Sequence, residues 1–123
     1  MKKIFTMFFT GLLLLTMVTG CYNDNEYDLY PFVACDSSNV TYSQTIAPIM
    51  IANCNVCHST VLASGGIVTD NYTGLSVIAK NGRLWGAVSH SAGFQAMPQN
   101  TSQLSDCDLG KIQIWVKAGY PNN

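Results

Sequence analysis

Charged residues are scarce in this sequence. Only 11% of its 123 residues are Asp, Glu, Lys or Arg, and 6 basic residues stand against 7 acidic ones. The scattered Lys and Arg form no basic stripe that could neutralise phosphates, which argues against binding to nucleic acid. With 48% hydrophobic residues, the chain is also too apolar to be disordered throughout. Its length leaves room for one folded domain.

The sequence also lacks strand patterns, a long apolar run and a catalytic set. No segment sustains an alternation of apolar and polar residues, which predicts an all-α domain. The uncharged run 4–20 is shorter than the roughly 20 apolar residues of a membrane-spanning helix. No Ser/His/Asp set, carboxylate pair or phosphate-binding loop would support hydrolysis or group transfer, so we expect no catalytic residues.

The N-terminus is typical of an exported protein. Two lysines precede the apolar run 4–20, as in the basic and apolar regions of a secretory signal. The run ends in Val18-Thr19-Gly20-Cys21, which resembles the bacterial lipobox. This resemblance implies that residues 1–20 are a cleaved lipoprotein signal peptide and that Cys21 carries lipid on its sulfur. Such a lipid holds a protein on a membrane surface without a spanning helix.

Residues 21–34 have neither a helical nor an alternating period, which predicts a flexible tether. Three acidic residues follow the lipid site, namely Asp24, Glu26 and Asp28. They argue against a plain transmembrane anchor, and they are similar to the acidic stretch that sends lipoproteins to the cell surface in some Bacteroidetes. The folded domain is expected in residues 35–123, anchored in the cell envelope and facing the periplasm or the cell surface.

One short motif carries specific chemistry. The run Cys54-Asn55-Val56-Cys57-His58 has the C-x-x-C-H pattern of c-type haem attachment. On a helical turn, residues three apart share a face, so both thiols reach the two vinyl groups of one porphyrin edge. The next residue, His58, is then placed under the iron as its proximal ligand.

Three alternative sites would account for these residues less well. A thioredoxin-like redox pair needs a βαβ unit, and no strand pattern precedes Cys54. A zinc site needs four ligands, and only the distant His90 could join Cys54, Cys57 and His58. A simple disulfide between Cys54 and Cys57 would leave the position of His58, directly after Cys57, unexplained.

The two cysteines that remain, Cys35 and Cys107, are expected to form a disulfide. The expected export places the domain in an oxidising compartment, where paired cysteines persist. A small domain gains stability from such a cross-link.

Hydrophobic periodicity predicts four helical segments. One amphipathic helix runs through residues 46–58 and delivers the haem motif, although Pro48 makes its start uncertain or kinks it. Short helices are expected over 72–79 and 83–88. The last helix starts at Ser105, which forms a capping-box-like pattern with Asp108, and stops at Gly119. Its Trp115 is expected to pack in the core near the haem.

The second axial ligand would come from the polar loop 89–103, which contains Met97-Pro98. A thioether sulfur is a soft ligand that favours ferrous iron and raises the reduction potential. Pro98 restricts Met97 to extended conformations, which helps to hold the sulfur in place. His90 is the rival ligand and would give a lower potential, whereas Met50 lies on the proximal helix and is expected in the core.

The chain resembles small lipoprotein cytochromes c, especially those of Bacteroidetes. The likeness covers nearly all of 35–123, and its informative parts are C-x-x-C-H and Met97-Pro98. It implies a helical cytochrome c fold, one covalent haem c and electron transfer. It also favours Met97 over His90 as the distal ligand, with His90 as a hydrogen-bonding wall residue.

Three functions follow from these patterns. The first is a membrane-anchored monohaem cytochrome that passes single electrons between a redox donor and acceptor and is not an enzyme. The second is a haem-based ligand sensor or peroxidase-like protein whose distal site is open or assisted by His90. The third is an interaction module without haem. The sequence does not specify the redox partners or the oligomeric state.

Overall fold

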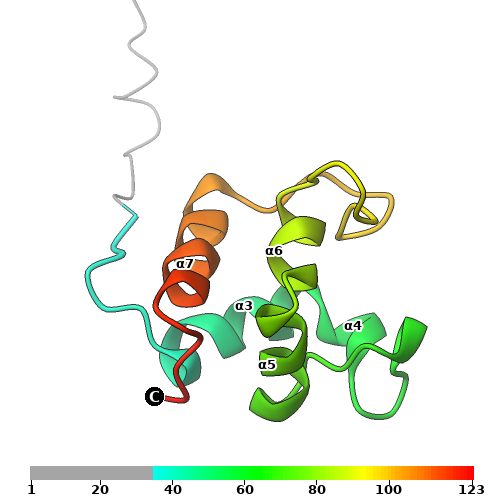
Figure 1. The fold of residues 1–123 in the computed structure, drawn as a ribbon, viewed down its shortest axis with the longest axis horizontal. Helices are drawn as coiled ribbons and strands as arrows, with labels where there is room; N and C mark the ends of the chain where they lie inside the picture. Colours follow the sequence, from blue (N-terminus) through cyan, green and yellow to red (C-terminus); the bar gives the residue numbers. More distant parts are fainter. Residues whose placement is uncertain (1–34) are drawn as a thin grey trace, which may run out of the picture. The chain divides into compact units, whose positions relative to one another are not determined.

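The computed structural model describes residues 35–123, and the expected signal peptide 1–20, the lipid site Cys21 and the tether 21–34 lie outside these described residues. Helices and turns account for all regular structure within 35–123, and none of it is a strand. The expectation of a small all-α domain is therefore confirmed. The elements, shown in Figure 1, are η2 (Tyr42–Ile46), α3 (Ala47–Asn53), α4 (Asn55–His58), η3 (Ser64–Gly66), α5 (Tyr72–Lys80), α6 (Arg83–Val88) and α7 (Asp106–Lys117).

The first helical segment is interrupted at Cys54, so the prediction of one helix over 46–58 is wrong in detail. It opens with the π-helical turn η2, which Thr41 caps by accepting a hydrogen bond from the backbone N–H of Gln44 at 3.2 Å. Pro48 falls in the first turn of α3, where η2 gives way to the α-helix. The backbone then leaves helical geometry at Cys54 (φ −121°, ψ −41°) before α4 begins.

Helices α5 and α6 follow from local signals. Asn71 caps α5 by accepting from the N–H of Gly74 at 2.9 Å, and the predicted inner face of α5 is buried. Gly82 adopts φ 77°, a left-handed conformation that suits glycine and separates the two helices. Leu84 and Val88 then turn the apolar face of α6 inward.

Helix α7 closes the domain. Ser105 accepts from the N–H of Asp108 at 3.1 Å, as the capping pattern predicts. Cys107, in its first turn, is bonded to Cys35, which confirms the expected disulfide. Trp115 is fully buried, and its indole N–H donates to the carbonyl of Pro121 at 3.0 Å. It packs beside Tyr42 and lines neither of the two cavities described below, so the structure supports its expected place in the core.

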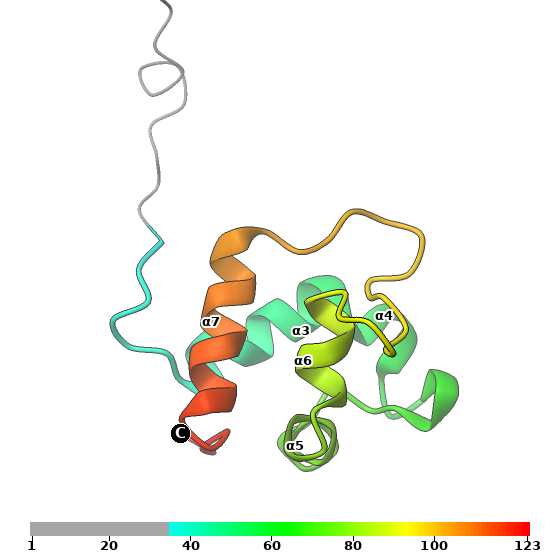
Figure 2. The same cartoon turned by 45° about the horizontal axis from the view of Figure 1, so that its top comes forward.

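The core lies where α7 packs on η2 and α6, and where α5 packs on α6. It consists of Ile46, Ile49, Met50, Leu75, Ile78, Ala79, Leu84, Val88, Leu104, Ile112 and Trp115. Figures 1 and 2 both show the loop between α6 and α7 extending over the side of the domain where α4 lies. Among the helices of residues 35–123, none has the length and apolar character needed to cross a membrane.

Candidate cofactor site

A cavity of about 590 Å³ opens between α4, α6 and the loop that follows α6. A smaller adjoining cavity of about 120 Å³ extends toward α5 and has several lining residues in common with it. The larger volume is within the ~300–1,000 Å³ of typical cofactor sites. The residues that line both cavities are Cys54, His58, Ile67, Arg83, Val88, Gln95 and Met97.

His58 is held by a single hydrogen bond to the backbone. Its Nδ1 lies 3.0 Å from the carbonyl oxygen of Ser64. Because a carbonyl oxygen only accepts, Nδ1 carries the proton and donates it. In the neutral ring the lone pair is then on Nε2, the nitrogen that a metal would use. Metal-ligating histidines almost always fix their second nitrogen in this way.

The two thiols of the motif differ in environment. Cys54 is partly buried and lines both cavities, whereas Cys57 is exposed and lines only the larger one. Burial raises the pKa of the Cys54 thiol to about 11, which keeps it neutral and makes it a poor attacking thiolate. The two cysteines are not bonded to each other, which argues against a simple disulfide at the motif.

The zinc and thioredoxin-like alternatives find no support in this part of the chain. Within residues 35–123, no three His, Cys, Asp or Glu side chains are grouped as a metal ion would require. The motif is also followed by no βαβ unit in that range, because the described residues contain no strand.

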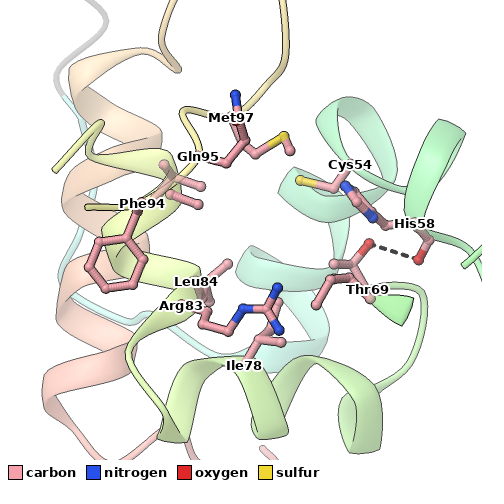
Figure 3. Close-up of a pocket in the computed structure, with 12 residues that line it drawn as sticks. Cys54, His58, Thr69, Ile78, Arg83, Leu84, Phe94, Gln95 and Met97 are labelled. Atoms are coloured by element: carbon pink, nitrogen blue, oxygen red, sulfur yellow. Dashed lines mark hydrogen bonds between the residues drawn. The ribbon is translucent and has the colours of Figure 1, made fainter. Parts of the chain in front are cut away.

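Met97 lies across the cavity from the motif. In Figure 3 its thioether points into the space that the Cys54 thiol and the His58 imidazole also face. The loop that carries it is fastened to consecutive carbonyl groups at the end of α6. The oxygens of Gly86, Ala87 and Val88 accept from Ser91 N (2.9 Å), Met97 N (3.0 Å) and Gln103 Nε2 (3.0 Å).

His90 is placed differently. It lines neither cavity, and its side chain is exposed. Its Nε2 donates to the carbonyl oxygen of Met97 at 3.0 Å. The fold therefore gathers Cys54, Cys57, His58 and Met97 around one space and leaves His90 at its edge.

Arg83 belongs to the site, although no sequence pattern predicted it there. It is the one charged residue that lines either cavity, and Figure 3 shows its guanidinium reaching into the space below Cys54 and Met97. No Asp or Glu occurs between residues 71 and 105, so the arginine has no acidic neighbour along the chain. Lys80 and Arg83 are the two cations of this segment, and the absence of any acidic partner for them is the signal that could have drawn attention to Arg83.

Phe94 is a second residue of the site that was not predicted. Its ring packs on α6 at Gly86, where an added Cβ would lie 2.5 Å from ring atoms. Glycine is needed here because any side chain would displace the ring. Phe94 lines the smaller cavity, so this contact fixes part of the wall of that cavity.

Comparison with known proteins gave no match to a family model, a curated protein or a solved structure.

Proposed function

We propose that this protein is a membrane-anchored monohaem c-type cytochrome that transfers single electrons between redox proteins of the cell envelope. The observation that carries the proposal is the bond from His58 Nδ1 to Ser64, at 3.0 Å, in a residue that lines a cavity opposite Met97. That bond fixes the tautomer of His58 in which Nε2 can bind a metal.

The lining of the cavity fits a haem group. The apolar side chains that line one or both of the adjoining cavities, as a flat porphyrin ring requires, include Ile67, Ile78, Leu84, Val88, Phe94 and Leu104. Cys54 and Cys57 would hold the ring through thioethers, and His58 and Met97 would bind the iron. Arg83 would face a carboxylate of the cofactor, because it is the one cation of the lining.

The group, when bound, supplies an iron that cycles between Fe(III) and Fe(II). The side chains of the site would set the potential of that iron and control the approach of ligands and redox partners. Met97 offers a neutral, polarisable sulfur that favours Fe(II) and keeps small ligands away from the iron. Cys57 and its neighbour Val56, 75% exposed, leave one edge of the site close to the surface, where a redox partner can approach. Lipid on Cys21 would anchor the domain through the tether 21–34.

The deciding experiment is a pair of absorption spectra on the mature protein, made in a host with haem-attachment machinery. Haem that survives denaturing purification would establish the thioethers. A ferric charge-transfer band typical of sulfur ligation would then support the carrier function, and the Cys54→Ser/Cys57→Ser variant, processed in parallel, should retain no haem.

Two different outcomes would point away from a carrier. Covalent haem without that band, together with rapid stoichiometric binding of carbon monoxide to the reduced protein, would favour the sensor or peroxidase-like alternative. Absence of covalent haem from the wild-type protein would contradict the proposal.

A further inference from the structure

Two adjacent residues, Thr69 and Asp70, form hydrogen bonds at the two ends of the loop whose Ser64 carbonyl accepts from His58. The loop comprises residues 59–68, and Thr69 ties its end to the motif. The N–H of Thr69 donates to His58 O at 2.7 Å, and its hydroxyl donates to Asn55 Oδ1 at 2.8 Å. Thr69 is only 4% exposed, so this attachment belongs to the domain interior.

The next residue, Asp70, is hydrogen-bonded to Thr60 at the start of the same loop. Its Oδ2 accepts from the backbone N–H of Thr60 at 2.6 Å, and its Oδ1 accepts from the Thr60 hydroxyl at 2.7 Å. The side-chain amide of Asn71 adds a third donor at 3.0 Å. The bonds from Thr60 are the main reason that the pKa of Asp70 is below the ordinary value, which keeps the carboxylate ionised.

The loop has little else to fix its shape. Val61 is 91% exposed and Leu62 61%, so burial of side chains does not hold this part of it. Ala63, Gly65 and Gly66 all have positive φ angles: the two glycines have many alternative conformations in a free chain, and Ala63 adopts one that alanine disfavours. The position of the Ser64 carbonyl therefore depends on hydrogen bonds.

One planar peptide group connects Asp70 to that carbonyl. The N–H of Thr60 and the C=O of Ser59 belong to the same rigid peptide unit. Asp70 binds its N–H, and its oxygen accepts from Leu62 N at 3.1 Å and Ala63 N at 2.7 Å. Holding this plane fixes the turn through Ala63, and Ser64 follows directly.

We propose that Asp70 is a positioning residue for His58. Its carboxylate orients the Ser59–Thr60 peptide, which sets the turn that aims Ser64 O at Nδ1 of the imidazole. The redox consequence rests on the proposed function. A strong bond at Nδ1 makes the imidazole a more basic ligand and stabilises Fe(III). Loosening the loop should weaken that bond and raise the midpoint potential.

The test uses two pairs of variants of the mature protein. Asp70→Ala and Asp70→Asn make the same change in charge, but only Asn retains an acceptor for Thr60. Thr60→Val and Thr60→Ser change no charge, and only Ser retains the hydroxyl. Asp36→Ala is the matched control, because Asp36 accepts from the N–H and hydroxyl of Ser38 at 3.0 and 2.7 Å and lines no cavity.

Two measurements are made on each variant. The first is the solvent exchange rate of the His58 Nδ1–H, followed by NMR on the reduced protein, and the second is the midpoint potential. We expect Asp70→Ala to speed exchange roughly tenfold or more, in line with the loss of bonds to a charged acceptor, and to raise the potential. Asp70→Asn and Thr60→Val should have smaller effects of the same sign. Thr60→Ser and Asp36→Ala should match the wild-type protein.

Wild-type exchange and potential in both Asp70→Ala and Thr60→Val would overturn the proposal, whatever their stability. So would equal shifts in Asp70→Ala and Asp36→Ala, since these would reflect charge alone. If Asp70→Ala does not fold, the comparison of Thr60→Val with Thr60→Ser decides whether the proposal holds. If the wild-type protein carries no haem, the proposed function fails, and the tautomer and exchange of His58 in the haem-free protein still test the role of Asp70.

Discussion

The ring Nε2 of His90 lies 3.0 Å from the carbonyl oxygen of Met97, so the two candidate distal ligands are hydrogen-bonded to each other. The bond occupies a nitrogen of His90 and leaves the sulfur of Met97 free. Met97 lines the cavity and His90 does not. The contact makes His90 a support for the loop that carries Met97.

Replacing Met97 should change the ligation of the iron. We expect Met97→Ala to lose the ferric charge-transfer band of sulfur ligation, to lower the midpoint potential, and to bind carbon monoxide when reduced. Met50→Leu is the matched control, because Met50 is fully buried in the core and Leu conserves its volume. It should keep the band and cost less than about 1.5 kcal/mol of stability.

The matching test of the alternative distal ligand is the replacement of His90. His90→Ala should keep the sulfur band, since it removes only a bond to the Met97 backbone. If Met97→Ala leaves spectrum and potential unchanged while His90→Ala alters both, the assignment of the distal ligand is wrong.

Arg83 should pair with an acidic group of the cofactor. In Arg83→Gln we expect a shift of the porphyrin carboxylate modes in the resonance Raman spectrum and a lower midpoint potential, because the exposed negative charge favours Fe(III). Lys80→Gln removes the same charge from a residue that lines no cavity and should leave those modes in place. Identical Raman spectra for wild type and Arg83→Gln would show that Arg83 does not pair with a carboxylate of the cofactor.

The Cys35–Cys107 disulfide should contribute to stability without affecting the site. The two residues are 72 apart in sequence, and closing a loop of that size destabilises the unfolded chain by about 4 kcal/mol in the chain-entropy model. We expect the Cys35→Ser/Cys107→Ser variant to lose that much free energy of unfolding in denaturant titrations. Its midpoint potential should stay at the wild-type value, since neither cysteine lines either of the two adjoining cavities. Two reactive thiols in the denatured, unreduced domain with haem attached, in which Cys54 and Cys57 would be thioethers, would contradict the cross-link; without haem, those two cysteines alone account for two thiols.

Acid should weaken the domain through Asp70 and Asp36. Hydrogen bonds from Thr60 lower the pKa of Asp70, and those from Ser38 lower the pKa of Asp36. A carboxyl with a lowered folded-state pKa contributes stability above its unfolded value, near 4 for Asp, and loses it as the pH falls through the folded value. The free energy of unfolding should therefore fall below about pH 4.

Each Asp→Asn variant should flatten that fall by removing one such group. The two effects should add in the double variant, because the two carboxylates share no hydrogen-bond partner. The measurement is a series of urea titrations at decreasing pH, and a slope equal to that of the wild type in Asp70→Asn would count against the assigned bonds.

Local signals determined the helices. The cap at Ser105, the inner face of α5 and the glycine after α7 act over a few residues, so they can be recognised in the sequence alone. Chemistry that depends on spacing was equally accessible: the C-x-x-C-H run places its candidate ligands within one turn, and elimination paired Cys35 with Cys107.

Only the tertiary structure decided which distant residues share the cavity. Periodicity showed neither the break at Cys54 nor that Arg83 and Phe94 face the same space as His58. Which of Met97 and His90 faces the cavity was likewise open at the level of residue spacing, because both lie in one loop. It was the packing of that loop on the carbonyl groups of α6 that turned the Met97 sulfur inward and left His90 bonded to its backbone, since hydrogen bonds between segments depend on positions that no local pattern encodes.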